Sequence, residues 1–339
     1  MTAPERLGGF KILKDVVRVS IVSCEGSGPS PSQVCKVVAE GEINLPYFTT
    51  VFDGQSWGLN FIVEAQDEGE ISRVLADHFG NIFFATPKSA VLSIFPHRKN
   101  PEITGKLFEV FDQQGLEPDA LANSPSTISV VIKEEILARA SDALFEPFSF
   151  GAYRTPEDWK LAQKGKERLY KEVVASYQEQ RPKVYGLEYY EDQDFIEIRM
   201  NRKDMGPLGA SFRGFARSGL NLVFISSAPT HEEGKDILAF CLPTSQSQTY
   251  GRIVQRIAPE VDIKGVSSVT IFSMNGPHFG DRYGIVSELL TSLSDEQVSL
   301  LALSCTIASI SGVVPSRQFE SALRAIRNCF DVPSLVKKE

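Results

Sequence analysis

The sequence predicts an α+β fold in which one small structural plan occurs four times. The pattern of apolar segments repeats after about 150 residues, and each of these two copies divides into two units. A charged stretch with helical character separates the copies. Since a repeated module usually works at the surfaces where its copies meet, this organisation favours binding over catalysis.

The repeat is clearest in units two and four. Unit two has an apolar run (AVLSIF, 90–95), a polar loop (PHRKNPE) and then apolar residues at helical spacing; unit four has its apolar run at 266–274, the loop NGPHFGD and a helical stripe that begins at Ile285. Two short strand-like runs and a second helical pattern follow in both units. The order strand, helix, strand, strand, helix, strand predicts a ferredoxin-like unit, with a four-stranded antiparallel sheet and both helices on one face.

Units one and three fit the same order more loosely, so the predicted architecture is two tandem pairs of such units. The predicted boundaries are 10–87, 88–152, 183–264 and 265–335, with a helical connector at 153–182. Thr155 and Pro156 suit the start of a connector helix that runs from roughly 156 to 180. Three first helices end at a glycine, which favours a left-handed cap at Gly41, Gly115 and Gly219.

Composition is ordinary for a soluble cytoplasmic protein. The chain has 339 residues and a formal net charge of −8, which argues against a nucleic-acid surface. No apolar run is long enough to span a bilayer, and the N-terminus lacks a signal-peptide core, so we expect no membrane association. The five cysteines show no CxxC spacing and are expected to be free thiols. Because each unit is small and its sheet has exposed edges, we expect pairing within the chain or a homodimer.

The segment GPHFGDRYGI (276–285) resembles an ACT domain, a regulatory module that binds amino acids. The runs LSCTIASISGVV from Leu303 and SPSTISVVI from Ser124 resemble strands of the ACT pair at the C-terminus of aspartokinase. The resemblance implies that an amino acid is held between two units, where the loop after the first strand of one unit faces the second strand of its neighbour.

The residues of this loop independently suit such a ligand. A carboxylate needs backbone N–H donors, and Gly276, Gly280 and Gly284 place them near a helix start. Asp281 could bind the ammonium group, or it could simply cap the helix. The predicted ligand-binding residues are Asn275, Gly276, His278, Phe279, Gly280, Asp281, Ser304 and Thr306; no catalytic residue, metal site or cofactor is predicted.

Other loops allow two interpretations each. Arg98 and Lys99 either recognise an acidic ligand or phosphate, or form a solvated basic turn. Gly206 and Gly209 in unit three could bind a carboxylate, while Met205 and Leu208 beside them suit a packing plug. Cys305 suits a packing position in a strand better than a nucleophile, which would need a paired base.

The sequence contains no phosphate-binding P-loop, no dinucleotide-binding fingerprint and no GxSxG elbow. We therefore expect a stand-alone, non-catalytic protein that binds a small amino acid at an interface between units and signals to a partner such as a metabolic enzyme. The alternative is a structural or partner-binding scaffold of ACT units that has lost ligand binding. An enzyme that uses His278 and Asp281 as an acid and base pair is a third interpretation.

Overall fold

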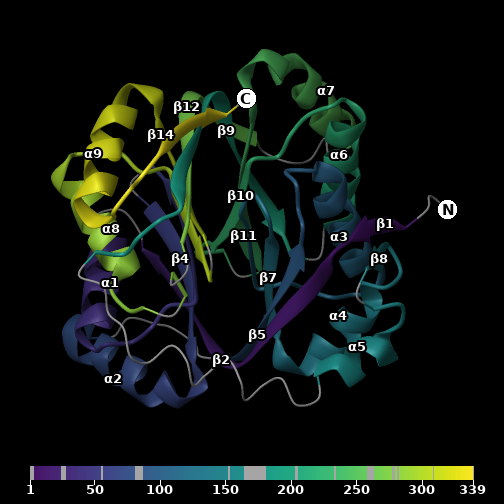
Figure 1. Ribbon diagram of the computed structural model, residues 1–339, viewed down its shortest axis with the longest axis horizontal. Coiled ribbons are helices and arrows are strands. Elements are labelled where there is room, and N and C mark those ends of the chain that lie inside the picture. Colours follow the sequence, from purple (N-terminus) through teal and green to yellow (C-terminus); the bar gives the residue numbers. More distant parts are fainter. Residues whose placement is uncertain are drawn as a thin grey trace.

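The computed structural model describes residues 4–23, 28–54, 56–80, 87–151, 153–163, 181–202, 205–232, 234–257, 263–276, 279–280, 282–307 and 309–338. Strands form the centre of the molecule, and helices lie on two opposite sides of them (Figure 1). The predicted α+β class is therefore confirmed at the level of one large sheet flanked by helices.

The described elements follow the chain in an order that repeats. The strands are β1 (Glu5–Leu7), β2 (Gly9–Ser23), β3 (Tyr47–Asp53), β4 (Ser56–Glu64), β5 (Lys88–Phe95), β6 (Ala120–Asn123), β7 (Ile128–Lys133), β8 (Phe148–Phe150), β9 (Gly186–Asn201), β10 (Phe224–Pro229), β11 (Lys235–Pro243), β12 (Ile263–Asn275), β13 (Ala302–Thr306), β14 (Ser309–Pro315) and β15 (Leu335–Lys338). The α-helices are α1 (Pro31–Glu40), α2 (Glu68–Phe79), α3 (Pro101–Gln113), α4 (Leu137–Ala143), α5 (Pro156–Gln163), α6 (Met205–Arg217), α7 (Ser247–Ile257), α8 (Ile285–Asp295) and α9 (Phe319–Cys329).

The order strand, helix, strand, strand, helix occurs four times. We define segment 1 as β2 to α2, segment 2 as β5 to α4, segment 3 as β9 to α7 and segment 4 as β12 to α9. A 3-10 turn stands before the second helix in every segment. The first helices are amphipathic for a local reason: on α1, Val34, Val37 and Val38 recur at helical spacing and are buried, while Ser30 caps the N-terminus.

Three long strands, β2, β9 and β12, connect the segments. The first part of β2 pairs with β5, and its second part pairs with β4. In the same way, the second part of β9 pairs with β11, while β12 runs along both parts of β9. The sequence did not indicate that one strand would serve two segments. Strand β2 begins in one segment at Gly9 and continues into the next at Val16. Its pairing with β5 has a register shift between Leu13 and Val16.

Strand pairing also joins segments that are distant in sequence. Strand β3 of segment 1 pairs with β13 of segment 4, from Phe48 opposite Cys305 to Val51 opposite Ala302. Strand β6 of segment 2 meets β10 of segment 3 at Ala122 and Ser226. With the β11–β9 pairing, the strand order closes into a ring. Pairing within the chain therefore covers edges that the sequence left open.

Hydrophobic clusters fill two kinds of space. Helices α1, α2, α8 and α9 pack on one side, over the sheet of segments 1 and 4, and α3, α4, α6 and α7 pack on the other side, over segments 2 and 3 (Figure 1). Two further clusters consist of strand residues and lie on the strand faces opposite the helices. The core thus has helix-side layers and an interior between strands.

This interior also holds charged side chains. The Asp119 carboxylate accepts hydrogen bonds from Arg18 at 3.2 Å and from Arg202 at 3.0 Å, and Arg202 also donates to Asp236 at 2.6 Å. These residues come from segments 1, 2 and 3. Buried charges are tolerated when they are paired, as they are here.

Several local predictions need correction. The extended pieces at the ends of the two copies are not regular fourth strands: β8 pairs with β1 in a separate two-stranded sheet, and β15 runs parallel to β9. Gly115 and Gly219 have the expected positive φ, but Gly41 has φ of −79° and Glu42 takes the left-handed conformation instead. Helix α5 begins at Pro156 as predicted, and the rest of the predicted connector helix, residues 164–180, lies outside the described residues.

Candidate functional site

The loop between β12 and α8 packs against the far end of β13. The Gly280 amide donates a 3.0 Å hydrogen bond to the Ile307 carbonyl oxygen. A Cβ atom at Gly280 would lie 2.7 Å from the Ile307 Cα, so this close approach requires glycine. The N-cap of α8 is Gly284, with φ of 85° and no side-chain hydrogen bond to the first turn. Asp281 is therefore not the N-cap residue, and its side chain lies outside the described residues, as does His278.

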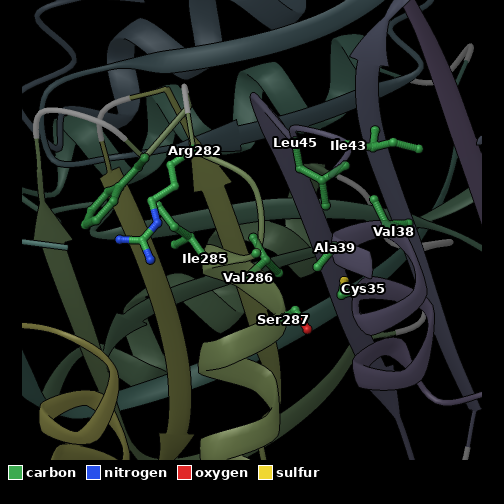
Figure 2. Close-up of a pocket in the computed structure, with 11 residues that line it drawn as sticks. Cys35, Val38, Ala39, Ile43, Leu45, Arg282, Ile285, Val286 and Ser287 are labelled. Carbon is green, nitrogen blue, oxygen red and sulfur yellow. The ribbon is translucent and has the colours of Figure 1, made fainter. Parts of the chain in front are cut away.

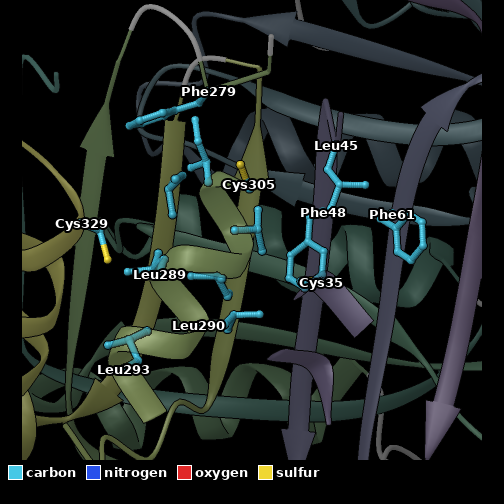
Figure 3. Packing of buried hydrophobic residues seen from close by; sticks show 14 of the residues in the cluster. Cys35, Leu45, Phe48, Phe61, Phe279, Leu289, Leu290, Leu293, Cys305 and Cys329 are labelled. Carbon is cyan, nitrogen blue, oxygen red and sulfur yellow. The ribbon is translucent and has the colours of Figure 1, made fainter. Parts of the chain in front are cut away.

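Phe279 fixes the loop from inside the hydrophobic core. Its ring is buried and meets Phe330 edge to face, with ring centroids 5.8 Å apart. Figure 3 shows Phe279 above Leu289 and Leu290 of α8. A Cβ atom at Gly276 would lie 2.8 Å from this ring, so Gly276 leaves space for it. Both residues thus shape the loop backbone.

The hydroxyl-bearing residues predicted for the site have partners or orientations of their own. Ser304 sits in β13 between Leu303 and Cys305, whose side chains belong to the helix-side cluster, so Ser304 is on the opposite face of the sheet. Thr306 hydrogen-bonds to Ser309 across its own hairpin, at 2.8 Å between the hydroxyl oxygens. Asn275 ends β12 and its carbonyl accepts from Tyr185 at 2.8 Å. The structure thus brings the loop to the end of β13, where the Thr306 hydroxyl is bonded within its own hairpin and Ser304 faces away from the helices.

A small cavity lies where segments 1 and 4 meet (Figure 2). Its free volume is about 10 Å³, which is the space of about one water molecule. Figure 2 shows Cys35 and Ala39 on α1 facing Val286 and Ser287 on α8, with Arg282 near the start of α8. The cavity is lined by Cys35, Val38, Ala39, Ile43, Leu45, Phe279, Arg282, Gly284, Ile285, Val286 and Ser287.

Segment 1 therefore contributes to the site, which the sequence did not predict. Asn44 Nδ2 donates a short hydrogen bond to the Gly280 carbonyl oxygen across the seam. The signal that could have revealed this contact is the position of Asn44 directly before β3, because β3 is the strand that pairs with β13. Sequence alone does not say which segments pair.

The electrostatics of the site come mainly from Arg282. Its guanidinium lies 3.7 Å from the Glu288 carboxylate, and about a fifth of the side chain is exposed. The two thiols nearby are inert: burial raises the pKa of Cys305 to about 12, and it raises the pKa of Cys35 still further, with a smaller contribution from Cys305. Cys305 is thus a packing residue and not an activated nucleophile.

The loops of segments 2 and 3 serve packing. Lys99 places its ammonium 4.4 Å from the centroid of the Tyr190 ring, and Arg98 is exposed, so neither forms an assembled anion site. Met205 and Leu208 are buried in the helix-side cluster, which supports the interpretation as a packing plug. His97 is fully buried, and burial lowers the pKa of its imidazole to about 4.

Comparison with known proteins shows similarity to an ACT domain and to aspartate kinases. The family model described as ACT domain matches residues 266–328, which contain the loop, α8 and β13. The aspartokinase of Bacillus sp. (strain MGA3) is 24% identical over 147 residues, which are 41% of this chain and 36% of the relative. The aspartate kinase structure from Synechocystis superposes with a TM-score of 0.77 at 18% identity, over 96% of this chain and 56% of that one. The regulatory subunit of aspartate kinase from Thermus thermophilus covers 44% of this chain at 16% identity, with a TM-score of 0.38.

These comparisons overturn one prediction. We expected a stand-alone protein that is not an enzyme, with a ligand-free scaffold as the alternative. The fold is instead that of an aspartate kinase over 96% of the chain, and the curated relative is an aspartokinase, which is a catalytic protein. The absence of P-loop, dinucleotide-binding and GxSxG motifs excludes only the enzymes that use those motifs. It was therefore not a sufficient reason to predict a protein without catalytic activity.

None of the helices within the described residues has the length and apolar character needed to cross a membrane. The chain is thus similar to aspartate kinases and contains an ACT domain match at 266–328.

Proposed function

We propose that this chain works in an aspartate kinase, an enzyme that transfers a phosphoryl group to aspartate, and that an amino acid effector controls the enzyme through it. The observation that carries the proposal is the superposition of 96% of the chain on an aspartate kinase. The chain spans little more than half of that relative, so the activity belongs to the proposal and not to the findings.

We propose further that the four segments are ferredoxin-like ACT units with boundaries near 10–87, 88–152, 183–264 and 265–335. The fourfold order of elements supports this division. In units two, three and four the fourth strand would come from a neighbour, since β2, β9 and β12 each run through two units. The ACT family match covers unit four, which is where the effector loop lies.

The effector is proposed to bind beside the loop after β12. The first-turn amides of α8 have no side-chain cap among the described residues, and the positive end of the helix dipole favours a carboxylate. The predicted residues Asn275, Gly276, His278, Phe279, Gly280, Asp281, Ser304 and Thr306 remain candidates. The Gly280 N–H donates to Ile307 and its carbonyl accepts from Asn44, and the Thr306 hydroxyl is bonded to Ser309, so the geometry favours the first-turn amides of α8 as the carboxylate contacts.

The test is an assay of the full natural protein for aspartate-dependent formation of ADP from ATP. Glutamate, which is one methylene longer, serves as the matched substrate control. We expect turnover with aspartate, and we expect at least one of the twenty amino acids to change the rate. If aspartate causes no ADP formation above the glutamate control, the kinase assignment is wrong.

A further inference from the structure

We propose that a proton on Glu197 controls how firmly the tip of the β3–β4 hairpin is held against β9 and β12. The side chains of Asp53, Glu197, Arg199 and Lys264 form this contact, which we call the latch. With the proton in place, the Asp53 carboxylate at the tip binds both cations. Without it, the negative charge of Glu197 repels Asp53 and attracts the same cations, so the tip loosens. The latch requires neither an effector nor a substrate, so it is independent of the proposed function.

Strand pairing with segment 4 ends before the tip of the hairpin. Strand β3 pairs with β13 only as far as Val51 opposite Ala302. The next residue, Phe52, donates a 2.9 Å backbone hydrogen bond to the Leu301 carbonyl oxygen, and Asp53 then begins the turn to β4. The Asp53 carboxylate therefore ties the tip to β9 and β12 at the point where this backbone pairing has ended.

Asp53 binds one cation from segment 3 and one from segment 4. Its carboxylate accepts a 2.7 Å hydrogen bond from Arg199 on β9 and a 3.0 Å hydrogen bond from Lys264 on β12. Burial acts to raise the pKa of Asp53, but the hydrogen bonds from both cations outweigh it and lower this pKa overall. Asp53 therefore stays ionised while Glu197 titrates.

Glu197 faces the same two cations. Lys264 lies directly opposite Glu197 on the neighbouring strand, and Arg199 follows two residues later on the same face of β9. The Oε1 atom of Glu197 is buried and has no hydrogen-bond partner within the described part of the chain. The residue opposite on β11 is Ala239, which carries no charge, and Glu232 joins the cluster by accepting a 3.3 Å hydrogen bond from Arg199. The Glu197 carboxyl group thus lies among charges without a donor for this oxygen.

These surroundings favour the protonated form of Glu197. Burial raises the pKa of its carboxyl group to about 7, and the charge of Asp53 adds to the rise, while Lys264 and Arg199 oppose it. In a loosened tip this pKa returns towards its ordinary value of 4.5. The latched form therefore binds the proton more tightly than the loosened form. Its advantage is complete below a pH of about 4.5 and is lost as the pH rises through about 7.

The experiment measures hydrogen–deuterium exchange of the Phe52 amide in the full natural protein at about pH 5 and about pH 8. Each rate is divided by the intrinsic exchange rate at the same pH, which gives a protection factor. We expect the protection of Phe52 to be at least about tenfold lower at the higher pH. We also expect it to stay below that of core amides such as Val131 and not to change in dilute urea, as a local opening requires.

Three variants assign the latch to its residues. Glu197→Gln cannot ionise, so its Phe52 amide should be equally protected at both pH values. Asp53→Asn weakens the ion pairs at the tip and should lower the protection of Phe52 about two- to fivefold at the lower pH. Glu320→Gln removes an exposed carboxylate on α9 and should behave as the wild type.

Equal protection of the wild-type Phe52 amide at both pH values would overturn the latch. A fall that persists in Glu197→Gln would do the same, since another group would then carry the proton. Protection of Phe52 as high as that of Val131 would mean that the tip opens only when the whole protein unfolds, which also overturns the latch. If Glu197→Gln does not fold, carbon-13 titration of the wild-type carboxyl groups decides: a pKa of Glu197 near 7 supports the latch, and a value near 4.5 overturns it.

Discussion

Glu197 lies on β9 with its side chain among charged groups from three segments. Burial raises the pKa of this carboxyl group to about 7, and the negative charge of Asp53 adds to the shift, while Lys264 and Arg199 act in the opposite direction. Its Oε1 atom has no hydrogen-bond partner within the described residues. The folded protein therefore holds a proton on Glu197 at a pH where the unfolded chain has lost it.

This shift of the Glu197 pKa predicts a pH-dependent loss of folding stability. Because the folded pKa of about 7 exceeds the unfolded value of 4.5, the folded state binds more protons in that window, and stability falls as pH rises through it. Glu197→Gln should remove this loss and raise the free energy of unfolding by about 1–3 kcal/mol more at about pH 8 than at about pH 5. Urea unfolding at both pH values measures the difference.

The exposed Glu320 on α9 provides the control. Glu320→Gln should change stability equally at both pH values. If Glu197→Gln also changes the free energy of unfolding equally at both pH values, Glu197 is ionised in the folded protein throughout this range.

At the candidate site, the sequence predicted the loop but not its partner. The glycines at 276, 280 and 284 were predicted as positions that place N–H donors for a carboxylate, and in the structure Gly276 and Gly280 allow close approach while Gly284 takes a positive φ. Asn44 was missed because it is 236 residues from Gly280 along the chain, and sequence does not reveal which segments pair. The sequence did not indicate the face of β13 on which Ser304 lies, since one residue of register decides which face of a strand a side chain occupies.

Among the elements, the α3–α6 pair shows how closely two helices approach when glycine permits it. A Cβ atom at Gly209 would meet the Gly105 carbonyl oxygen at 2.8 Å and the Glu109 Cγ at 2.9 Å. The first of these contacts is to backbone, which cannot rotate away. Phe108 and Phe212 pack edge to face beside this contact, with centroids 5.5 Å apart.

Gly209→Ala should therefore separate the helices and lower the free energy of unfolding by about 1–3 kcal/mol. Gly251→Ala in α7 is the matched control, because a Cβ atom there meets nothing within 4 Å. That variant should be neutral or more stable by up to about 1 kcal/mol, since alanine favours the helix over glycine. Guanidinium unfolding of both variants checks this; equal stability of the two would mean that the helices adjust without cost.

The elements themselves were largely predictable, and their connections were not. Apolar residues at helical spacing located α3 and α8, and β-branched runs located β7 and β14. The long strands β2 and β9 were read as single-unit strands because a strand that leaves one sheet region and enters another keeps the same alternating pattern. Glu42 and Gln297 have positive φ after the first helices of segments 1 and 4, so tertiary packing overrides the local preference for glycine there.

On the scale of the whole molecule, closing the strand order into a ring brings strands of segments 1 and 3 face to face across the interior. A Cβ atom at Gly58 on β4 would lie 2.2 Å from the Pro229 carbonyl oxygen on β10, and Thr49 donates a 2.9 Å hydrogen bond to the Ser227 carbonyl. These contacts join segment 1 to segment 3. Strand β3 lines the seam with segment 4 and β10 lines the seam with segment 2, so this contact links the two seams through the interior.

Asp119 holds this interior together electrostatically. Its carboxylate is buried and accepts from Arg18 and Arg202, which lie on different segments. Asp119→Ala would leave both guanidinium groups without their common acceptor in a buried space, so we expect a loss of about 3–5 kcal/mol in the free energy of unfolding.

Asp53→Ala is the matched control. Asp53 also joins segments, through Arg199 and Lys264, but its partners are exposed. That variant should lose no more than about 1 kcal/mol. Denaturant titration followed by both far-UV circular dichroism and tryptophan fluorescence measures the two losses. If Asp119→Ala is as stable as Asp53→Ala, the interior ion pairs do not hold the segments together. The apolar clusters on the strand faces opposite the helices must then do so alone.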